Sequence, residues 1–132
     1  MKNTPIVIIV VAVLVFTWDL FWWAMGVEPL LPCRLKNALT KNPEAFNLID
    51  VRTQTEYGLF HIDGSRNHPG LSLQPERFRD KDPGKPVVVI CMTGHRSPFV
   101  AYRLKKGGFT KVYNLTWGML GWLLSGGETR KR

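Results

Sequence analysis

The chain has 132 residues and a mass of 15.1 kDa, which leaves room for one domain and little more. With 45% hydrophobic residues, 21% charged residues and a mean hydropathy of -0.07, the chain is not a disordered tail, a collagen-like chain or a polytopic membrane protein. Two cysteines are too few for a disulfide-stapled miniprotein. The net charge of +8 lies entirely in residues 28–132, because residues 1–27 contain one basic and one acidic side chain.

The first 27 residues are strongly apolar. A helix from Ile6 to Gly26 would be about 31 Å long at 1.5 Å per residue, close to the thickness of a bilayer's hydrocarbon core. We expect residues 1–27 to be an uncleaved, single-pass transmembrane anchor with an interfacial belt of tryptophans, which are Trp18, Trp22 and Trp23. A cleaved signal peptide, starting at Lys2 and ending near Ala24-Met25-Gly26, is the main alternative, and a buried core helix is another.

Charge near the apolar segment bears on orientation and on partners. Three basic residues follow the segment closely, whereas only Lys2 and the amino terminus precede it; the three are Arg34, Lys36 and Lys41. This bias predicts that residues 28–132 face the cytoplasm, with a periplasmic or other extracytoplasmic position left open. The basic surplus also predicts attraction to membrane lipid. We expect no nucleic-acid partner, because the basic residues lack the interleaved aromatic side chains of a nucleic-acid platform.

From residue 28 onward, helical and strand patterns alternate, which predicts one α/β domain over residues 28–132. The expected helices are a segment from Pro32 to a stop at Asn42-Pro43, then Gln54–Leu59, Leu73–Phe78, Ser97–Lys106 and Gly118–Leu124. The expected strands are Phe46–Val51, Val87–Ile90 and Lys111–Leu115, with a strong turn signal at Asp82–Pro86. Because Val87–Ile90 is apolar on both faces, the sheet should be parallel and covered by helices.

The segment between this apolar strand and the next helix carries the candidate chemistry. Cys91 stands at the carboxyl end of the strand, where open α/β sheets bind ligands. The N-terminus of the following helix favours negative charge, and Arg96 adds a cation. Gly94 allows successive amides to turn inward as an anion nest. These surroundings stabilise a thiolate, so we expect a reactive Cys91, the alternative being an inert buried thiol.

Residues 30–124 resemble the rhodanese (sulfurtransferase) family in one order and register. The matching motifs are Leu48-Ile-Asp-Val-Arg52, Glu56-Tyr57, His61-Ile62, Gly64, Cys91-x-x-Gly94-x-Arg96-Ser97, Gly108-Phe109, Val112-Tyr113-Asn114-Leu115, Gly118 and Trp122. The resemblance implies a rhodanese-like α/β domain with a mostly parallel sheet flanked by helices. Three residues depart from the family's common Gly, Pro and Gly, namely Phe60, Asp63 and Trp117.

The resemblance also implies roles for individual residues. Cys91 would take sulfur from a donor such as thiosulfate, hold it as a persulfide and pass it to a thiol or cyanide-like acceptor. The loop that binds substrate and persulfide would comprise Met92, Thr93, Gly94, His95 and Arg96, with Arg96 orienting or neutralising anionic donors. Asp50 and Arg52 would support the loop. No metal or organic cofactor is implied, and a sulfur-trafficking protein is a candidate partner.

Other roles remain open for the two cysteines. Cysteine phosphatases and arsenate reductases, including relatives on this fold, use a Cys-x5-Arg loop, whereas Cys91 and Arg96 are one residue closer together. A Cys91–His95 hydrolase pair would lack a third residue to orient the histidine. Cys33 either resolves a Cys91 persulfide or is passive. The alternative function is a membrane-anchored, non-catalytic binding module that recruits a partner.

Overall fold

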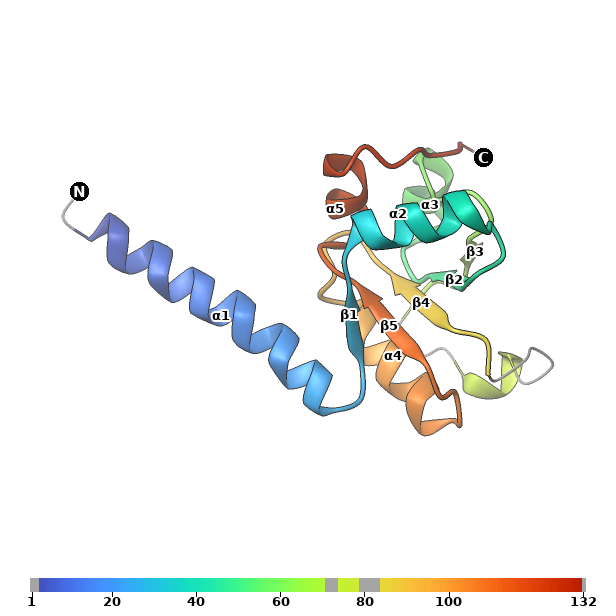
Figure 1. The fold of residues 1–132 in the computed structure, drawn as a ribbon, viewed down its shortest axis with the longest axis horizontal. Helices are drawn as coiled ribbons and strands as arrows, with labels where there is room; N and C mark the ends of the chain where they lie inside the picture. The colour runs from blue at the N-terminus through green and yellow to red at the C-terminus, as the bar shows by residue number, and fades with distance from the viewer. Residues whose placement is uncertain (1–2, 71–73, 79–83, 132) are drawn as a thin grey trace.

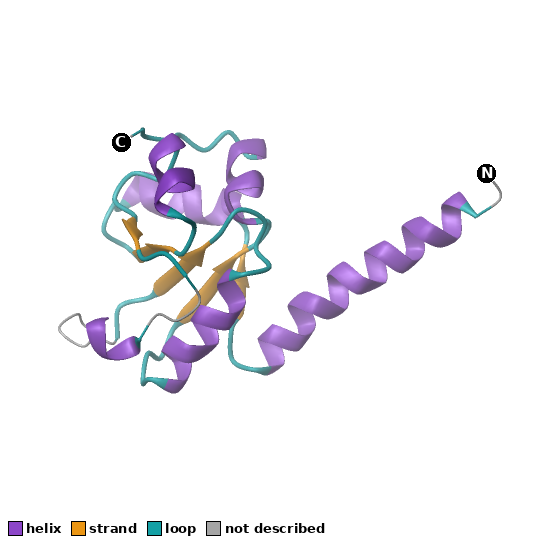
Figure 2. Ribbon diagram, turned by 180° about the vertical axis from the view of Figure 1, so that it is seen from behind, coloured by secondary structure: helices purple, strands orange, loops and turns teal. Residues whose placement is uncertain are grey.

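The computed structural model describes residues 3–70, 74–78 and 84–131, in which a parallel sheet is flanked by helices and preceded by one long helix (Figures 1 and 2). The elements in chain order are α1 (Thr4–Ala24), β1 (Glu28–Leu30), α2 (Pro32–Lys41), β2 (Asn47–Asp50), α3 (Gln54–Leu59), β3 (Arg66–Asn67), the 3-10 helix η1 (Pro75–Phe78), β4 (Val87–Ile90), α4 (Ser97–Lys106), β5 (Val112–Leu115) and α5 (Gly118–Leu124). The strand order is β1-β5-β4-β2-β3, and every paired strand is parallel to its neighbour. All carboxyl ends of the strands therefore lie at one edge of the sheet.

Strand β4 divides the core into two layers because its side chains alternate between the faces of the sheet. Val87 and Val89 pack with α4 and the end of α1 on one face, whereas Val88 and Ile90 pack with α2 and α5 on the other. All four residues are buried, each contributing about 1.5–3 kcal/mol of hydrophobic stabilisation. The central position of β4 holds the segment that follows it in a fixed place.

Most of the elements expected from the sequence are present. The bounds of α3, α4 and α5 match the prediction, and β2, β4 and β5 lie within the predicted strands. The predicted Leu73–Phe78 helix is present as η1 over its last four residues, while Leu73 lies outside the described residues. Residues 82–83 of the predicted turn also lie outside them. The α/β fold with a parallel sheet is thus confirmed.

Two strands were not predicted, and both are at the edges of the sheet. Strand β1 has three residues and includes Pro29, and β3 has two residues; within the described part of the chain, β1 pairs with β5 alone and β3 with β2 alone. Edge strands tolerate proline and need less hydrophobic sequence, because they have one neighbour rather than two. Local periodicity therefore contains little signal for either strand.

Helix α1 is long and apolar enough to cross a membrane by length and composition, although a signal sequence meets the same criteria. Its large apolar side chains between Ile6 and Phe16 are exposed for the most part, unlike those of a core helix. The last turns differ, because Trp22 is only 6% exposed and packs on Phe99 and Tyr102 of α4. The expected belt of three interfacial tryptophans is therefore wrong for Trp22, which belongs to the core of the domain.

Candidate functional site

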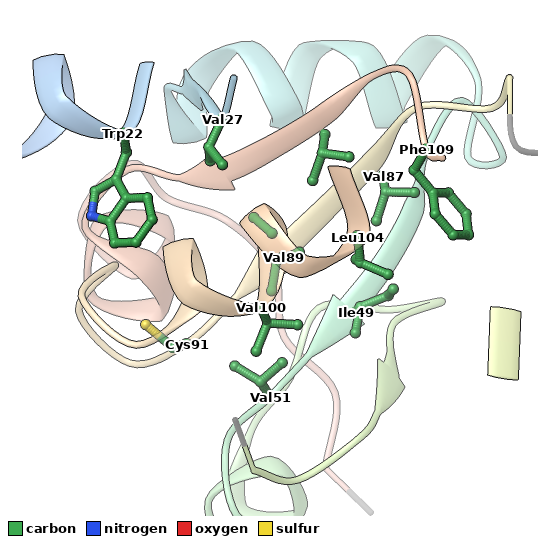
Figure 3. Packing of buried hydrophobic residues seen from close by; sticks show 12 residues of the cluster. Trp22, Val27, Ile49, Val51, Val87, Val89, Cys91, Val100, Leu104 and Phe109 are labelled. Carbon is green, nitrogen blue, oxygen red and sulfur yellow. The ribbon is translucent and has the colours of Figure 1, made fainter. Parts of the chain in front are cut away.

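The thiol of Cys91 is buried at the carboxyl end of β4, beside the start of α4 (Figure 3). Two donors point at its sulfur. The backbone N–H of Gly94 lies 3.0 Å from Sγ, and the hydroxyl of Ser97 lies 3.3 Å from it. Because Ser97 is the first residue of α4, the sulfur also lies at the positive end of that helix. Both donors and the N-terminus of the helix direct partial positive charge toward the sulfur.

The backbone of Gly94 gives the loop its shape. Its φ of +81° lies in the left-handed region, which favours glycine. A Cβ atom at this position would lie 2.9 Å from the amide nitrogen of Trp117 and 3.0 Å from the carbonyl oxygen of Leu115. The loop therefore packs backbone to backbone against the turn between β5 and α5, which only glycine permits.

The start of α5 holds the other side of the loop. The carbonyl of Cys91 accepts a hydrogen bond from the N–H of Met119 at 2.8 Å, and the carbonyl of Met92 accepts one from the N–H of Leu120 at 3.0 Å. Gly118, at φ +53°, lies so close to the carbonyl of Cys91 that a side chain there would clash. Trp117 has a φ of 60°, which lies in the left-handed region that favours glycine.

Two buried polar residues, Ser97 and Asn114, form a hydrogen-bonded pair next to the sulfur of Cys91. The hydroxyl of Ser97 lies within hydrogen-bond distance of Oδ1 of Asn114 as well as of the Cys91 sulfur. The side-chain NH2 of Asn114 donates to the carbonyl of Gly94 at 3.1 Å. The sequence prediction did not assign a role to either residue. One signal was present, because Asn114 interrupts an otherwise apolar strand.

Arg96 is held by a neighbour from α3. Its guanidinium donates to the carboxylate of Glu56 at 3.1 Å, with the arginine side chain 43% exposed. Glu56 also closes a capping box with Thr53 at the start of α3. Burial raises the pKa of Glu56, but hydrogen bonds from the backbone and side chain of Thr53 and from Arg96 outweigh it, so the pKa lies below its ordinary value. Sequence reasoning did not predict Glu56 as a partner of the loop.

Asp50 and Arg52 form a fully buried ion pair next to this site. Nε and Nη2 of Arg52 donate to the carboxylate of Asp50 at 2.7–3.1 Å. The same guanidinium donates to the carbonyls of Glu56 and Phe60, at 3.2 and 2.6 Å. The pair therefore braces α3 and reaches the Cys91 loop through Glu56.

The remaining loop residues form the outer rim. Thr93 and His95 are exposed, and Nδ1 of His95 lies 3.1 Å from the hydroxyl of Thr93. The His95 ring lies against the rings of Trp18 and Trp117, with centroids 5.6 and 6.2 Å away. Cys33 is an exposed free thiol near the start of α2. Within the described ranges, no three His, Cys, Asp or Glu side chains gather in a group suited to a metal ion.

Comparison with known proteins gives a consistent family. The family model of the Rhodanese-like domain matches residues 32–125. The chain is 37% identical over 79 residues to the putative sulfur carrier protein YrkF of Bacillus subtilis, a match that covers 60% of this chain and 42% of YrkF. It is 35% identical over 75 residues to the thiosulfate sulfurtransferase GlpE of Pseudomonas fluorescens, covering 57% of this chain and 68% of GlpE.

A likeness in structure extends over more of the chain. The solution structure of the polysulfide-sulfur transferase homodimer from Wolinella succinogenes has 30% sequence identity to this chain and a TM-score of 0.68, and the likeness covers 88% of both chains.

Proposed function

The chain belongs to the rhodanese-like domain family, and we propose that it transfers sulfane sulfur through a persulfide on Cys91. One observation carries the proposal: a buried thiol faces the N–H of Gly94 and the hydroxyl of Ser97 at the N-terminus of α4. The names of the relatives, a sulfur carrier, a thiosulfate sulfurtransferase and a polysulfide-sulfur transferase, support sulfur as the transferred atom.

The proposed reaction has two displacements. The Cys91 thiolate attacks the outer sulfur of a donor such as thiosulfate; the new sulfur–sulfur bond forms as the donor's own breaks, and sulfite leaves with the electron pair. A thiolate or cyanide acceptor then attacks the terminal sulfur of the persulfide. The bond to Cys91 breaks, the thiolate is regenerated, and no oxidant or reductant is consumed.

Each residue of the loop has a proposed part in these steps. The amide of Gly94 and the hydroxyl of Ser97 hold negative charge on the sulfur, and the amides of residues 92–96 receive the persulfide. The ion pair between Arg96 and Glu56 holds the loop in place, and Arg96 remains beside the loop as a partly exposed cation. The short Cys91–Arg96 spacing suits one added sulfur atom better than an encircled phosphate group.

We further propose that α1 anchors the protein in a membrane, with the domain on the cytoplasmic side. The length and composition of α1 and the exposure of its apolar side chains support an anchor. The basic residues that follow it favour the cytoplasmic side. A reporter fused at Arg132 that is active only in one compartment tests this orientation, and activity in the extracytoplasmic compartment would contradict it.

A second candidate function rests on the complete burial of the Cys91 thiol. A buried thiol suits a module that recruits a partner without turnover. For such a module, the Cys91→Ser variant would bind the partner as well as the wild type does, and neither protein would transfer sulfur.

Sulfur loading of the full-length chain in detergent tests the proposed function. We expect thiosulfate to add the mass of one sulfur atom, and cyanide to remove it as thiocyanate. Cys91→Ser should abolish both results, whereas the control Cys33→Ser should retain them. An unmodified wild-type protein, or a Cys91→Ser variant with full activity, would contradict the proposal.

A further inference from the structure

Helix α4 lies along the last turns of α1 and runs in the same direction. The ring of Trp18 contacts that of His95, just before α4, with centroids 5.6 Å apart. The ring of Trp22 contacts that of Tyr102, one to two turns into α4, with centroids 6.3 Å apart. Gly26 lies beside the side chain of Lys105 near the end of α4. The start of α4, with the Cys91 loop, therefore points toward the apolar N-terminal part of α1, and Figure 3 shows Trp22 and Cys91 near the same end of α4.

The contact between α1 and the loop is close. The crevice between them is lined by Trp18, Thr93, His95 and Trp117, among others, and has a volume of about 10 Å³. That volume holds at most about one water molecule. The loop is thus seated directly against α1 at the level of Trp18.

The length of α1 sets the depth of this contact in a bilayer. The helix begins at Thr4, so about 14 residues, roughly 21 Å of helix, precede Trp18. A hydrocarbon core is about 30 Å thick, and tilting α1 would shorten its reach further. Because the helix ahead of Trp18 is shorter than the core, crossing the bilayer draws Trp18, and with it the rim of the Cys91 loop, at least as deep as the interfacial region.

The edge of the domain that would meet the bilayer exposes apolar side chains. Because every strand is parallel, the Cys91 loop and the turn into α5 share the carboxyl edge of the sheet. Large apolar side chains are exposed on the two helices that begin at this edge and at the turn before α5: Phe99 of α4 is 46% exposed, Trp117 45%, and Leu120 and Leu124 of α5 43% and 81%. Tryptophan at an interface and aliphatic side chains below it are typical of surfaces that rest on lipid.

We propose that this carboxyl edge, defined by Phe99, Trp117, Leu120 and Leu124, rests in the headgroup layer of the bilayer that α1 crosses. The inference builds on the anchor in the proposed function. It places the rim residues Thr93 and His95 at the membrane surface. A donor or acceptor that approaches Cys91 past Thr93 and His95 would then do so at the membrane surface.

Depth-dependent quenching of the full-length chain tests this placement. A bimane label is attached to one introduced cysteine, Leu120→Cys or Leu124→Cys, in a background of Cys33→Ser and Cys91→Ser. Each labelled chain is reconstituted in phosphatidylcholine vesicles that contain 5-doxyl lipid as the quencher. The matched control is Lys111→Cys, an exposed site at the amino end of β5. Leu14→Cys, exposed on α1, reports insertion of the helix.

We expect the labels at 120 and 124 to be quenched about threefold more strongly than the label at 111. Interfacial groups lie about 5–10 Å into the headgroup boundary, and the length of β5 separates the amino and carboxyl edges of the sheet by roughly 13 Å. Strong quenching at 14 with equally weak quenching at 120, 124 and 111 would overturn the inference and leave the anchor intact. No quenching at 14 would overturn both the anchor and the inference. Sulfur loading of wild type reports separately on the proposed chemistry.

Discussion

The guanidinium of Arg96 donates a hydrogen bond to the carboxylate of Glu56, 3.1 Å away and 40 residues earlier in the chain. Glu56 is fastened to the start of α3 by Thr53, and its carbonyl accepts from Arg52. The ion pair thus connects the Cys91 loop to a buried brace. It also offsets the charge of Arg96, so stabilisation of a thiolate depends mainly on the Gly94 amide, the Ser97 hydroxyl and the helix N-terminus.

The first prediction concerns Glu56 and acid stability. Its pKa in the folded chain is lowered below the ordinary value of 4.5, because hydrogen bonds from Thr53 and Arg96 outweigh the opposing effect of burial. A lowered pKa stabilises the fold above the ordinary pKa, and this stabilisation is lost as the pH falls through the folded value. We expect the free energy of unfolding to decrease as the pH drops below about 4.5, and to decrease less in the Glu56→Gln variant.

Denaturant unfolding at stepped pH values measures this effect. The control Glu44→Gln, at an exposed site, should retain the wild-type loss of stability. A Glu56→Gln variant with the same acid dependence as wild type would contradict the role of the carboxylate.

The second prediction concerns Gly94, with Gly64 as its control. Both glycines have positive φ angles, +81° and +79°, but only a Cβ at Gly94 would meet backbone atoms. We expect Gly64→Ala to cost about 1–2 kcal/mol in backbone strain and to retain sulfur loading. Gly94→Ala should cost more and lose most sulfur loading, because the amide that faces Cys91 is displaced. Unfolding and intact mass measure the two effects, and equal loading by both variants would refute the prediction.

The third prediction concerns the single proton of the Ser97 hydroxyl, which has two acceptors, Cys91 Sγ and Asn114 Oδ1. Ser97→Ala removes a hydrogen bond to the reacting thiolate, worth about 1.5–3 kcal/mol, so alkylation of Cys91 at neutral pH should slow about 10- to 150-fold. Asn114→Ala should accelerate alkylation, because Ser97 then donates only to the sulfur.

A double variant separates this competition from simple damage to the loop. If Asn114 acts through Ser97, Asn114→Ala should not accelerate alkylation in the Ser97→Ala background. An equal acceleration in both backgrounds would show that Asn114 acts by another route, such as its bond to the carbonyl of Gly94.

The fourth prediction concerns the buried Asp50–Arg52 pair. Arg52→Met leaves the carboxylate of Asp50 buried without its partner, which should destabilise the chain by about 3–5 kcal/mol. The double variant Asp50→Leu/Arg52→Met removes both charges and should be less destabilised than Arg52→Met alone. Denaturant unfolding of the two variants measures the difference, and a double variant that is less stable than the single one would contradict a role as an ion-pair brace.

Local sequence determined the central elements of the domain. Glycine and proline bound α4 and α5, and four consecutive β-branched residues form β4, so short-range propensities and the tertiary structure favour the same conformation. The position of Cys91 between a buried strand and a helix also follows from neighbouring residues. The parallel sheet, and the family resemblance of the Cys91–Arg96 loop, were therefore predictable from the chain alone.

Tertiary structure decided which distant residues complete the site. Glu56 and Asn114 reach the loop from α3 and β5, and Trp22 of the apolar segment packs on α4. Edge strand β1 exists only through its pairing with β5. None of these contacts has a local signature, because each forms when the sheet brings together segments far apart in the sequence. Short-range patterns determine helices and strands, whereas the partners of a buried thiol depend on how those elements pack.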